Sequence, residues 1–187
     1  MEDFWETLKF EISLVGAELL PDDKREVLIG CGNKNADILF IGDDPSLYFD
    51  ETPKFEVGSS GFFLNRLLDI EDISTNMYYI TTLSKRPVKI KTFMGDARNK
   101  LLKFLNMQIA LINPKIIVLL GKEAYKALLG REDFEENLGN YLLWTGGIKV
   151  LVTYDVKTVM EARMDESKKS RIPPNFWRDI KTIKQNL

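Results

Sequence analysis

Asp37-Ile-Leu-Phe-Ile-Gly42 is the stretch of sequence that decides the fold. Its four central residues are all apolar, and a glycine ends the run. A strand with one face in water would alternate apolar and polar residues, whereas an unbroken apolar run indicates a strand buried on both faces of a parallel sheet. The run therefore predicts a parallel sheet that is covered by helices on both sides.

Three later runs have the same character, and helical patterns separate them. These runs are Met77–Thr82, Lys115–Leu120 and Ile148–Thr153. Strands that alternate with helices are typical of a parallel sheet in an α/β fold. The sequence thus predicts a three-layer α/β/α architecture with a central, mainly parallel sheet of about four strands. Apolar residues at helical spacing add an N-terminal helix from Phe4 to Leu19, and Pro173-Pro174 begins a C-terminal helix.

Composition limits the kinds of site that the chain can form. The 187 residues include no histidine and one cysteine, Cys31, and the formal net charge is -2. Imidazole chemistry, an intramolecular disulfide and a cysteine-rich metal site are therefore excluded, and we expect no cofactor. The net charge offers no global attraction to nucleic acid. The apolar runs are too short to span a membrane, so we expect one cytoplasmic, monomeric domain over residues 1–187.

Polar side chains follow each predicted strand, at the edge of the sheet where α/β folds bind ligands. The loops after the strands are Asp43–Ser46, Ser84–Pro87, Gly121-Lys122 and Tyr154–Lys157. Because the carboxyl ends of parallel strands share one edge, these loops should converge. The sequence therefore predicts the functional site there.

Five blocks of sequence in these regions resemble the family 4 uracil-DNA glycosylases. Gly30–Asp37 followed by Gly42–Ser46 is similar to the family's G-x-G-N-x-x-A-D, strand and G-E-x-P-G. Later blocks keep the family's order: they are Val57–Leu68, Tyr79–Pro87, Ile112–Gly130 and Thr153-Tyr154. Because five blocks in order are far more specific than one motif, the resemblance covers residues 28–160 and implies the uracil-DNA glycosylase fold.

The sequence departs from the family at the positions that carry its chemistry. The family binds an iron–sulfur cluster through four cysteines, whereas Lys85 is followed directly by Arg86 and Cys31 is the one thiol. The family's glutamate, asparagine and histidine correspond to Asp43, Thr82 and Asp155. A carboxylate near a developing oxyanion repels it unless protonated, so Asp155 replaces the histidine poorly. The resemblance thus implies either a diverged base-excision DNA-repair glycosylase or a member that binds nucleic acid or a nucleobase without hydrolysis. In both cases the uracil site is degenerate and the cluster is lost.

The resemblance assigns candidate residues to three roles. Asp43 and Asp155 are the catalytic candidates; Asp44, Phe55 and Thr82 would form the base pocket; and six residues would bind DNA, namely Lys85, Arg86, Lys89, Lys157, Val159 and Met160, the last two as an apolar wedge. Turn capping by Asp43 and Asp44, and core packing of Phe55, Val159 and Met160, are the alternative interpretations. The four cations predict weak, salt-sensitive DNA binding.

Two other functions remain open from the sequence. One is a non-catalytic interaction module on the same fold, because a fold alone does not fix a function. The other is a Mg²⁺ site formed by Asp43, Asp44 and Asp155, since carboxylate oxygens are preferred Mg²⁺ ligands.

Overall fold

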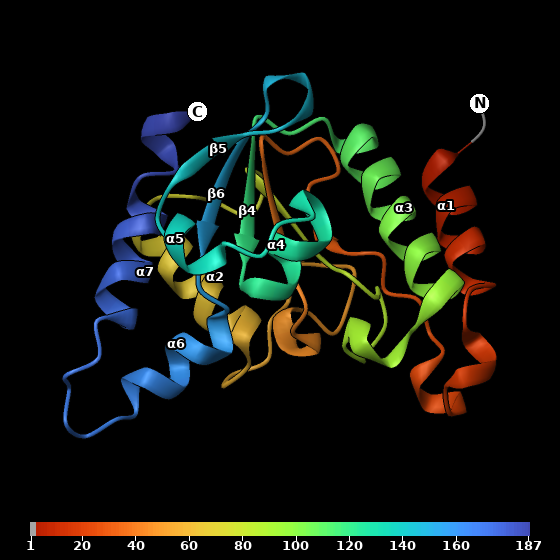
Figure 1. Cartoon of the computed structure of the whole chain (residues 1–187), viewed down its shortest axis with the longest axis horizontal. Coiled ribbons are helices and arrows are strands. Elements are labelled where there is room, and N and C mark those ends of the chain that lie inside the picture. Colours follow the sequence, from red (N-terminus) through yellow and green to blue (C-terminus); the bar gives the residue numbers. More distant parts are fainter. Residues whose placement is uncertain (1–2) are drawn as a thin grey trace.

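The computed structural model describes residues 3–187, which form a six-stranded sheet between two layers of helices (Figure 1). The strands are β1 (Cys31–Gly32), β2 (Ile38–Gly42), β3 (Tyr78–Thr82), β4 (Ile116–Leu120), β5 (Tyr141–Leu143) and β6 (Lys149–Thr153). Their order across the sheet is β1-β3-β2-β4-β6-β5. The four central strands are parallel, as predicted, and their carboxyl ends share one edge.

The two edge strands were not predicted. β1 pairs antiparallel with β3, and β5 pairs antiparallel with β6. They contain two and three residues, too few for a hydrophobic period to appear. The sheet therefore has six strands where the sequence predicts about four. The four predicted strands are its parallel centre.

Seven helices complete the fold within the described residues. They are α1 (Phe4–Ser13), α2 (Ser60–Ile70), α3 (Gly95–Ile112), α4 (Lys122–Leu129), α5 (Phe134–Asn137), α6 (Val156–Arg163) and α7 (Ile172–Lys181). The N-terminal helix is shorter than predicted, because Gly16 has a left-handed backbone (φ 66°) and a short 3-10 turn follows it. None of these helices combines the length and the apolar composition that crossing a bilayer requires.

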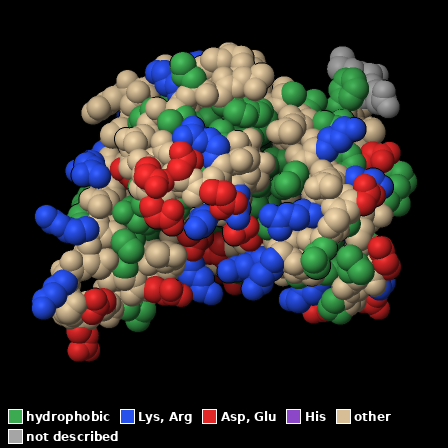
Figure 2. Space-filling model, viewed as in Figure 1, with side chains coloured by type: hydrophobic (Ala, Val, Ile, Leu, Met, Phe, Trp, Pro, Cys, Tyr) green, Lys and Arg blue, Asp and Glu red, His purple; other side chains and the backbone are tan. Residues whose placement is uncertain are grey.

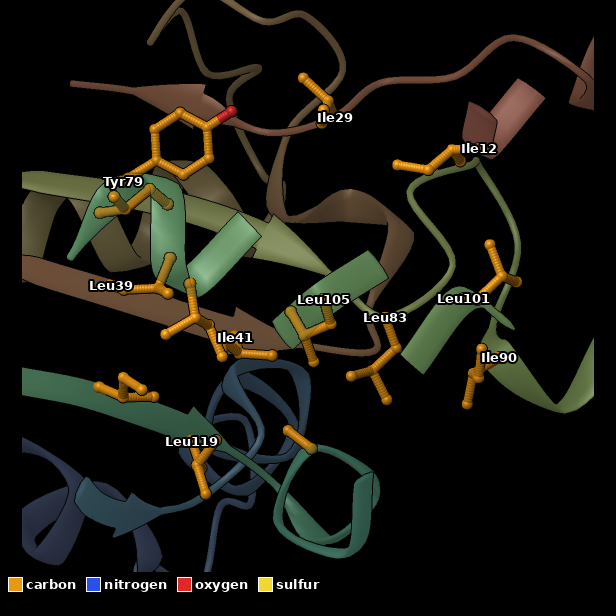
Figure 3. Close-up of a cluster of buried hydrophobic side chains, with 14 of the residues drawn as sticks. Ile12, Ile29, Leu39, Ile41, Tyr79, Leu83, Ile90, Leu101, Leu105 and Leu119 are labelled. Atoms are coloured by element: carbon orange, nitrogen blue, oxygen red, sulfur yellow. The ribbon is translucent and has the colours of Figure 1, made fainter. Parts of the chain in front are cut away.

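Two hydrophobic cores lie on opposite faces of the sheet, because side chains alternate between the faces along each strand. On one face, Leu39 and Ile41 of β2 pack with α1, α3, α4 and α5. Figure 3 shows part of this core, in which Leu105 of α3 lies between Ile41 and Leu83 in the view. On the other face, Ile38 and Phe40 pack with α2, α6 and α7. This arrangement confirms the predicted three layers.

Candidate functional site

A cleft with a volume of about 310 Å³ lies where β2, β4 and β6 end. Figure 2 shows acidic and basic side chains side by side over the region where β4 and β6 end in Figure 1. The lining residues come mostly from the loops after these three strands and from α4, α5 and α6: Asp43, Asp44, Lys89, Leu120, Gly121, Lys122, Glu123, Phe134, Glu135, Tyr154, Asp155, Lys157 and Thr158. The predicted edge of the sheet therefore does carry a cleft.

Asp43 directly follows β2 and is half-buried in the cleft. Its Oδ1 accepts a hydrogen bond from the backbone N–H of Ile90 at 2.8 Å, and no protein donor bonds Oδ2 within the described chain. Burial raises the pKa of the Asp43 carboxyl to about 6, although the Ile90 hydrogen bond opposes this shift. Asp43 is thus anchored through one oxygen and presents the other.

Asp155 follows β6 and caps the N-terminus of α6. Its Oδ2 accepts hydrogen bonds from the backbone N–H of Thr158 at 3.2 Å and from the hydroxyl of Thr158 at 3.3 Å. In the part of the chain that the structure describes, Oδ1 has no such partner. Burial, and secondly the charge of Asp44, raise the pKa of the Asp155 carboxyl. The N-cap geometry therefore fixes this second carboxylate in the cleft.

Neither Asp43 nor Asp155 has a cationic partner within 4 Å among residues 3–187. The charge of the exposed Lys89 opposes, without reversing, the rise in the pKa of both carboxyls. The cleft floor thus holds two half-buried carboxylates whose charge is only partly balanced.

Asp44 has a different role in the structure. Its Oδ1 accepts from both the backbone N–H and the hydroxyl of Ser46 at 2.8 Å, and its Oδ2 accepts from the hydroxyl of Ser60. The side chain caps the 3-10 turn Pro45–Leu47 and is 6% exposed. Asp44 therefore lines the cleft, but both of its oxygens are engaged by the fold, as the capping alternative predicts.

Thr82 and Phe55, two residues of the predicted base pocket, do not line the cleft. Thr82 is buried, and its hydroxyl oxygen accepts from the backbone N–H of Lys85 at 3.1 Å and lies 3.3 Å from the Tyr48 hydroxyl. Phe55 packs against the core formed with α2 and lies close to Gly61. Packing holds Phe55 and local hydrogen bonds hold Thr82 outside this cleft, so the structure does not bring these two residues together with Asp43 and Asp155.

Lys85 and Arg86 are buried, which contradicts the predicted phosphate contacts by these two residues. Lys85 is 0% exposed, and its Nζ donates to the Thr81 hydroxyl at 3.0 Å and to the Thr82 carbonyl at 3.1 Å. Burial lowers the pKa of Lys85 to about 7. Arg86 donates to the Ile12 carbonyl at 2.9 Å and the Ser13 carbonyl at 3.2 Å. Both cations hold the β3 loop inside the protein.

Lys89 and Lys157, in contrast, are exposed and line the cleft. Neither forms an ion pair within 4 Å in the described residues, whereas Lys122 lies 3.6 Å from Glu135. Val159 and Met160 do not project from the surface as the predicted apolar wedge would. Val159 is 1% exposed, and Met160 is half-buried against the core that α2, α6 and α7 form on the sheet. The core-packing alternative holds for both residues, because α6 turns its apolar side toward the sheet.

Neither of the two inorganic sites considered for this chain fits the structure. Among residues 3–187, no group of three or more His, Cys, Asp or Glu is placed to hold a metal ion, so the Mg²⁺ alternative at Asp43, Asp44 and Asp155 is wrong for this conformation. The family's four-cysteine cluster does not fit either. Cys31, the single cysteine, is buried in β1, and burial raises the pKa of its thiol to about 12, which keeps it protonated.

Several cleft residues were not among the predicted site residues. Tyr154 follows β6, and Lys122 begins α4 directly after Gly121. The strand pattern places both positions at this edge, so the sequence carried a signal for them. Phe134 and Glu135 lie on α5, a four-residue helix with no period of its own. Only the packing of α5 against α4 and the core brings these two residues to the cleft.

The chain matches one family model and is similar in sequence to several enzymes. Residues 29–181 match the model of the uracil DNA glycosylase superfamily. The chain is 31% identical over 147 residues to the type-4 uracil-DNA glycosylase of Thermotoga maritima, and these residues cover 77% of each protein. It is also 31% identical over 137 residues to the type-4 enzyme of Saccharolobus solfataricus, covering 69% of this chain and 63% of that protein. A third type-4 enzyme, from Archaeoglobus fulgidus, is 31% identical over 115 residues, which cover 60% of this chain and 57% of its own length.

Proposed function

Because this chain belongs to the uracil-DNA glycosylase superfamily, we propose that it is a DNA-binding, base-excision-repair member whose cleft accepts a single extruded base. One observation carries the proposal: the cleft joins two anchored, half-buried carboxylates on its floor to exposed lysines at its rim. A flipped base needs a pocket with polar groups, and the phosphates beside it need cations. The cleft offers both.

The rim lysines supply the attraction to DNA that the net charge of -2 does not. Lys89 and Lys157 are free of ion pairs in the described chain, and Lys122 has one exposed acidic neighbour, Glu135. Each neutralised phosphate contributes close to one unit to the log–log salt dependence, so two or three contacts give a slope of about -2 to -3 on duplex DNA. Binding is therefore weak and sensitive to salt.

Uracil excision by this cleft is weak or absent. Bond cleavage spreads negative charge onto the uracil, and the type-4 pattern places a histidine where Asp155 stands here. An ionised carboxylate at that position opposes the charge, and loss of one stabilising donor costs about 10²–10³ in rate. Thr82 does not compensate, because its hydroxyl lies outside the cleft.

Fluorescence anisotropy across a salt series, together with excision assays on DNA that contains uracil, hypoxanthine or xanthine, tests this function. We expect weak binding that Lys89→Ala and Lys157→Ala reduce, whereas Lys184→Ala, an exposed lysine outside the cleft, leaves it unchanged. Absence of binding even at low salt would favour the non-catalytic interaction module. Uracil excision at the rate of an active type-4 enzyme would show that the account of Asp155 is wrong.

A further inference from the structure

We propose that a groove between α2 and α6 is a docking site for an acidic peptide segment of a partner protein. The groove has a volume of about 340 Å³ and is lined by residues of these two helices, which pack against each other, and of the turn before α2 (Figure 1). None of its lining residues lines the cleft at the strand ends. The proposal therefore goes beyond the proposed function and does not depend on it.

The floor of the groove is apolar. Phe63, Leu67 and Ile70 are spaced at i, i+4 and i+7, so they lie on one side of α2. Phe63, Leu67 and Met160 of α6 are half-buried against the core, whereas Ile70 is 58% exposed. The apolar side of α2 therefore continues from the core to the surface. A partner that covers it gains the free energy of burying apolar area.

The charged groups of the groove are two guanidinium groups. Arg66 and Arg163 line it, and no Asp or Glu does. Both arginines are exposed, and neither forms an ion pair within 4 Å in the described chain. The acids of the two helices, Asp69 and Glu161, lie outside the groove. Carboxylates of a ligand can therefore bind both arginines, whose N–H groups match a carboxylate in pairs.

Positive charge continues beyond one end of the groove. Arg163 also lines a neighbouring hollow, together with three basic residues of the loop between α6 and α7: Lys168, Lys169 and Arg171. One acid, Asp165, lines this hollow, and its carboxylate accepts hydrogen bonds from the backbone N–H of Ser167 at 3.0 Å and from its hydroxyl at 2.8 Å. The surface around the groove thus favours an anionic partner.

The composition of the groove favours a protein segment over nucleic acid. Aromatic residues, methionine and arginine are enriched in protein interfaces, from which lysine and acidic residues are depleted, and the groove follows both trends. Interfaces with DNA are more polar. Bases also stack on free aromatic faces, but the guanidinium of Arg163 lies over the ring of Phe63, 5.2 Å from its centroid.

The chemistry of the partner segment follows from these groups. One or two apolar side chains, such as leucine or phenylalanine, would enter the groove between the helices. Aspartate or glutamate beside them would bind Arg66 and Arg163. Apolar anchors in a groove, flanked by charge-assisted hydrogen bonds, are a recurring way in which proteins recognise peptides.

Selection from a displayed library of random peptides, each roughly a dozen residues long, against the whole chain tests the proposal. We expect the enriched peptides to combine aspartate or glutamate with at least one large apolar residue. Fluorescence anisotropy with a labelled enriched peptide measures its affinity, which should fall as the salt concentration rises, because salt screens exposed charges.

Variants assign the binding to the groove. Arg66→Glu, Arg163→Glu and Ile70→Glu should each weaken peptide binding about tenfold or more, because arginines and apolar anchors carry much of the binding energy of an interface. Lys184→Glu and Leu143→Glu make matched changes at exposed positions outside the groove and should leave the affinity unchanged. Thermal melts establish that each variant is folded.

Several outcomes would overturn the proposal. They are failure to enrich any peptide, enriched peptides without acidic residues, and equal affinity for the groove variants and the unchanged chain. A dimer in sedimentation velocity that Ile70→Glu dissociates would identify a second copy as the occupant instead. Loss of oligonucleotide binding in the groove variants but not in the controls, without an enriched peptide, would assign the groove to DNA. The proposed function is judged separately, because its test changes Lys89 and Lys157 in the cleft.

Discussion

Gly121 and Asp155 approach so closely that a Cβ atom added to Gly121 would lie 2.9 Å from the Cβ atom of Asp155. Gly121 lies between β4 and α4, and its φ of 97° with ψ of 173° is a backbone conformation that residues other than glycine rarely adopt. The β4–α4 loop therefore packs directly on the residue that caps α6. This contact fixes one carboxylate of the cleft relative to α4.

Gly121→Ala should destabilise the protein by about 1–3 kcal/mol and weaken any base preference, because the new methyl group strains the backbone and displaces Asp155. Gly130→Ala is the matched control: Gly130 also has a positive φ, 64°, but no atom lies within 4 Å of its added Cβ. Urea unfolding and anisotropy measure the two effects. Equal losses of stability in both variants, with unchanged binding, would contradict a role for the contact.

Lys85→Met should stabilise the protein at neutral pH and flatten its pH dependence. The pKa of Lys85 falls from 10.5 to about 7 in the folded state, so between these values the unfolded chain binds the extra proton. Stability therefore rises with pH in this window, by up to about 1.4 kcal/mol per pH unit, and the desolvation penalty is largest below pH 7. Urea unfolding from pH 6 to 10 checks the slope; an identical slope in Lys85→Met would refute the assignment.

Arg86→Met and Lys89→Met should separate stability from DNA binding. Arg86 ties the β3 loop to the carbonyls of Ile12 and Ser13, so its loss should cost about 2–4 kcal/mol, since hydrogen bonds of charged groups contribute roughly 1.5–3 kcal/mol each. Lys89→Met should leave stability within about 0.5 kcal/mol and reduce the duplex salt slope by about 0.9. Denaturation and salt titrations measure both. A reduced slope in folded Arg86→Met would restore a phosphate role for this residue.

Asp43→Asn should stabilise the protein at neutral pH and flatten its pH dependence between about pH 4 and 6. The folded pKa of Asp43 is raised from 3.8 to about 6, because burial disfavours the carboxylate. As the pH falls, the folded state therefore binds a proton before the unfolded chain does, so ionisation of Asp43 lowers stability as the pH rises from 3.8 to 6. Urea unfolding across this pH range checks the slope, and Glu161→Gln, which changes an exposed acid on α6, is the control. An unchanged slope in Asp43→Asn would contradict this account of its burial.

Asp155→His should raise uracil excision by at least tenfold over the unchanged protein. The imidazole replaces a repelling carboxylate with a group that can donate to the developing oxyanion, an effect that reaches about 10²–10³ in active enzymes. Asp155→Asn, which also removes the charge, is the control for repulsion alone. Single-turnover assays on uracil-DNA measure both variants. If neither cleaves faster than the unchanged chain, the cleft does not hold uracil in a reactive position.

The sequence by itself determined the parallel core and the edge of the sheet that carries the cleft. Unbroken apolar runs such as Ile38–Ile41 are stable only with helices on both faces, and parallel strands bring the residues after them to one edge, which places Asp43 and Asp155 together. The sequence also placed Asp44 at this edge. Because Pro45 follows it, the sequence already indicated that Asp44 could cap a turn.

The tertiary structure alone decided which charged residues face water and which residues complete the cleft. A loop that contains Lys85, Arg86 and Lys89 reads as uniformly basic, yet the first two cations bond buried oxygen atoms and only Lys89 is exposed. The carbonyl partners of Arg86 are more than 60 residues away in the chain, at the end of α1 and in the loop before β1. A local sequence pattern cannot reveal that a buried charge is hydrogen-bonded by residues so distant in the chain. Glu135 could not be predicted either, because it reaches the cleft through the packing of α5, a helix too short to show a hydrophobic period.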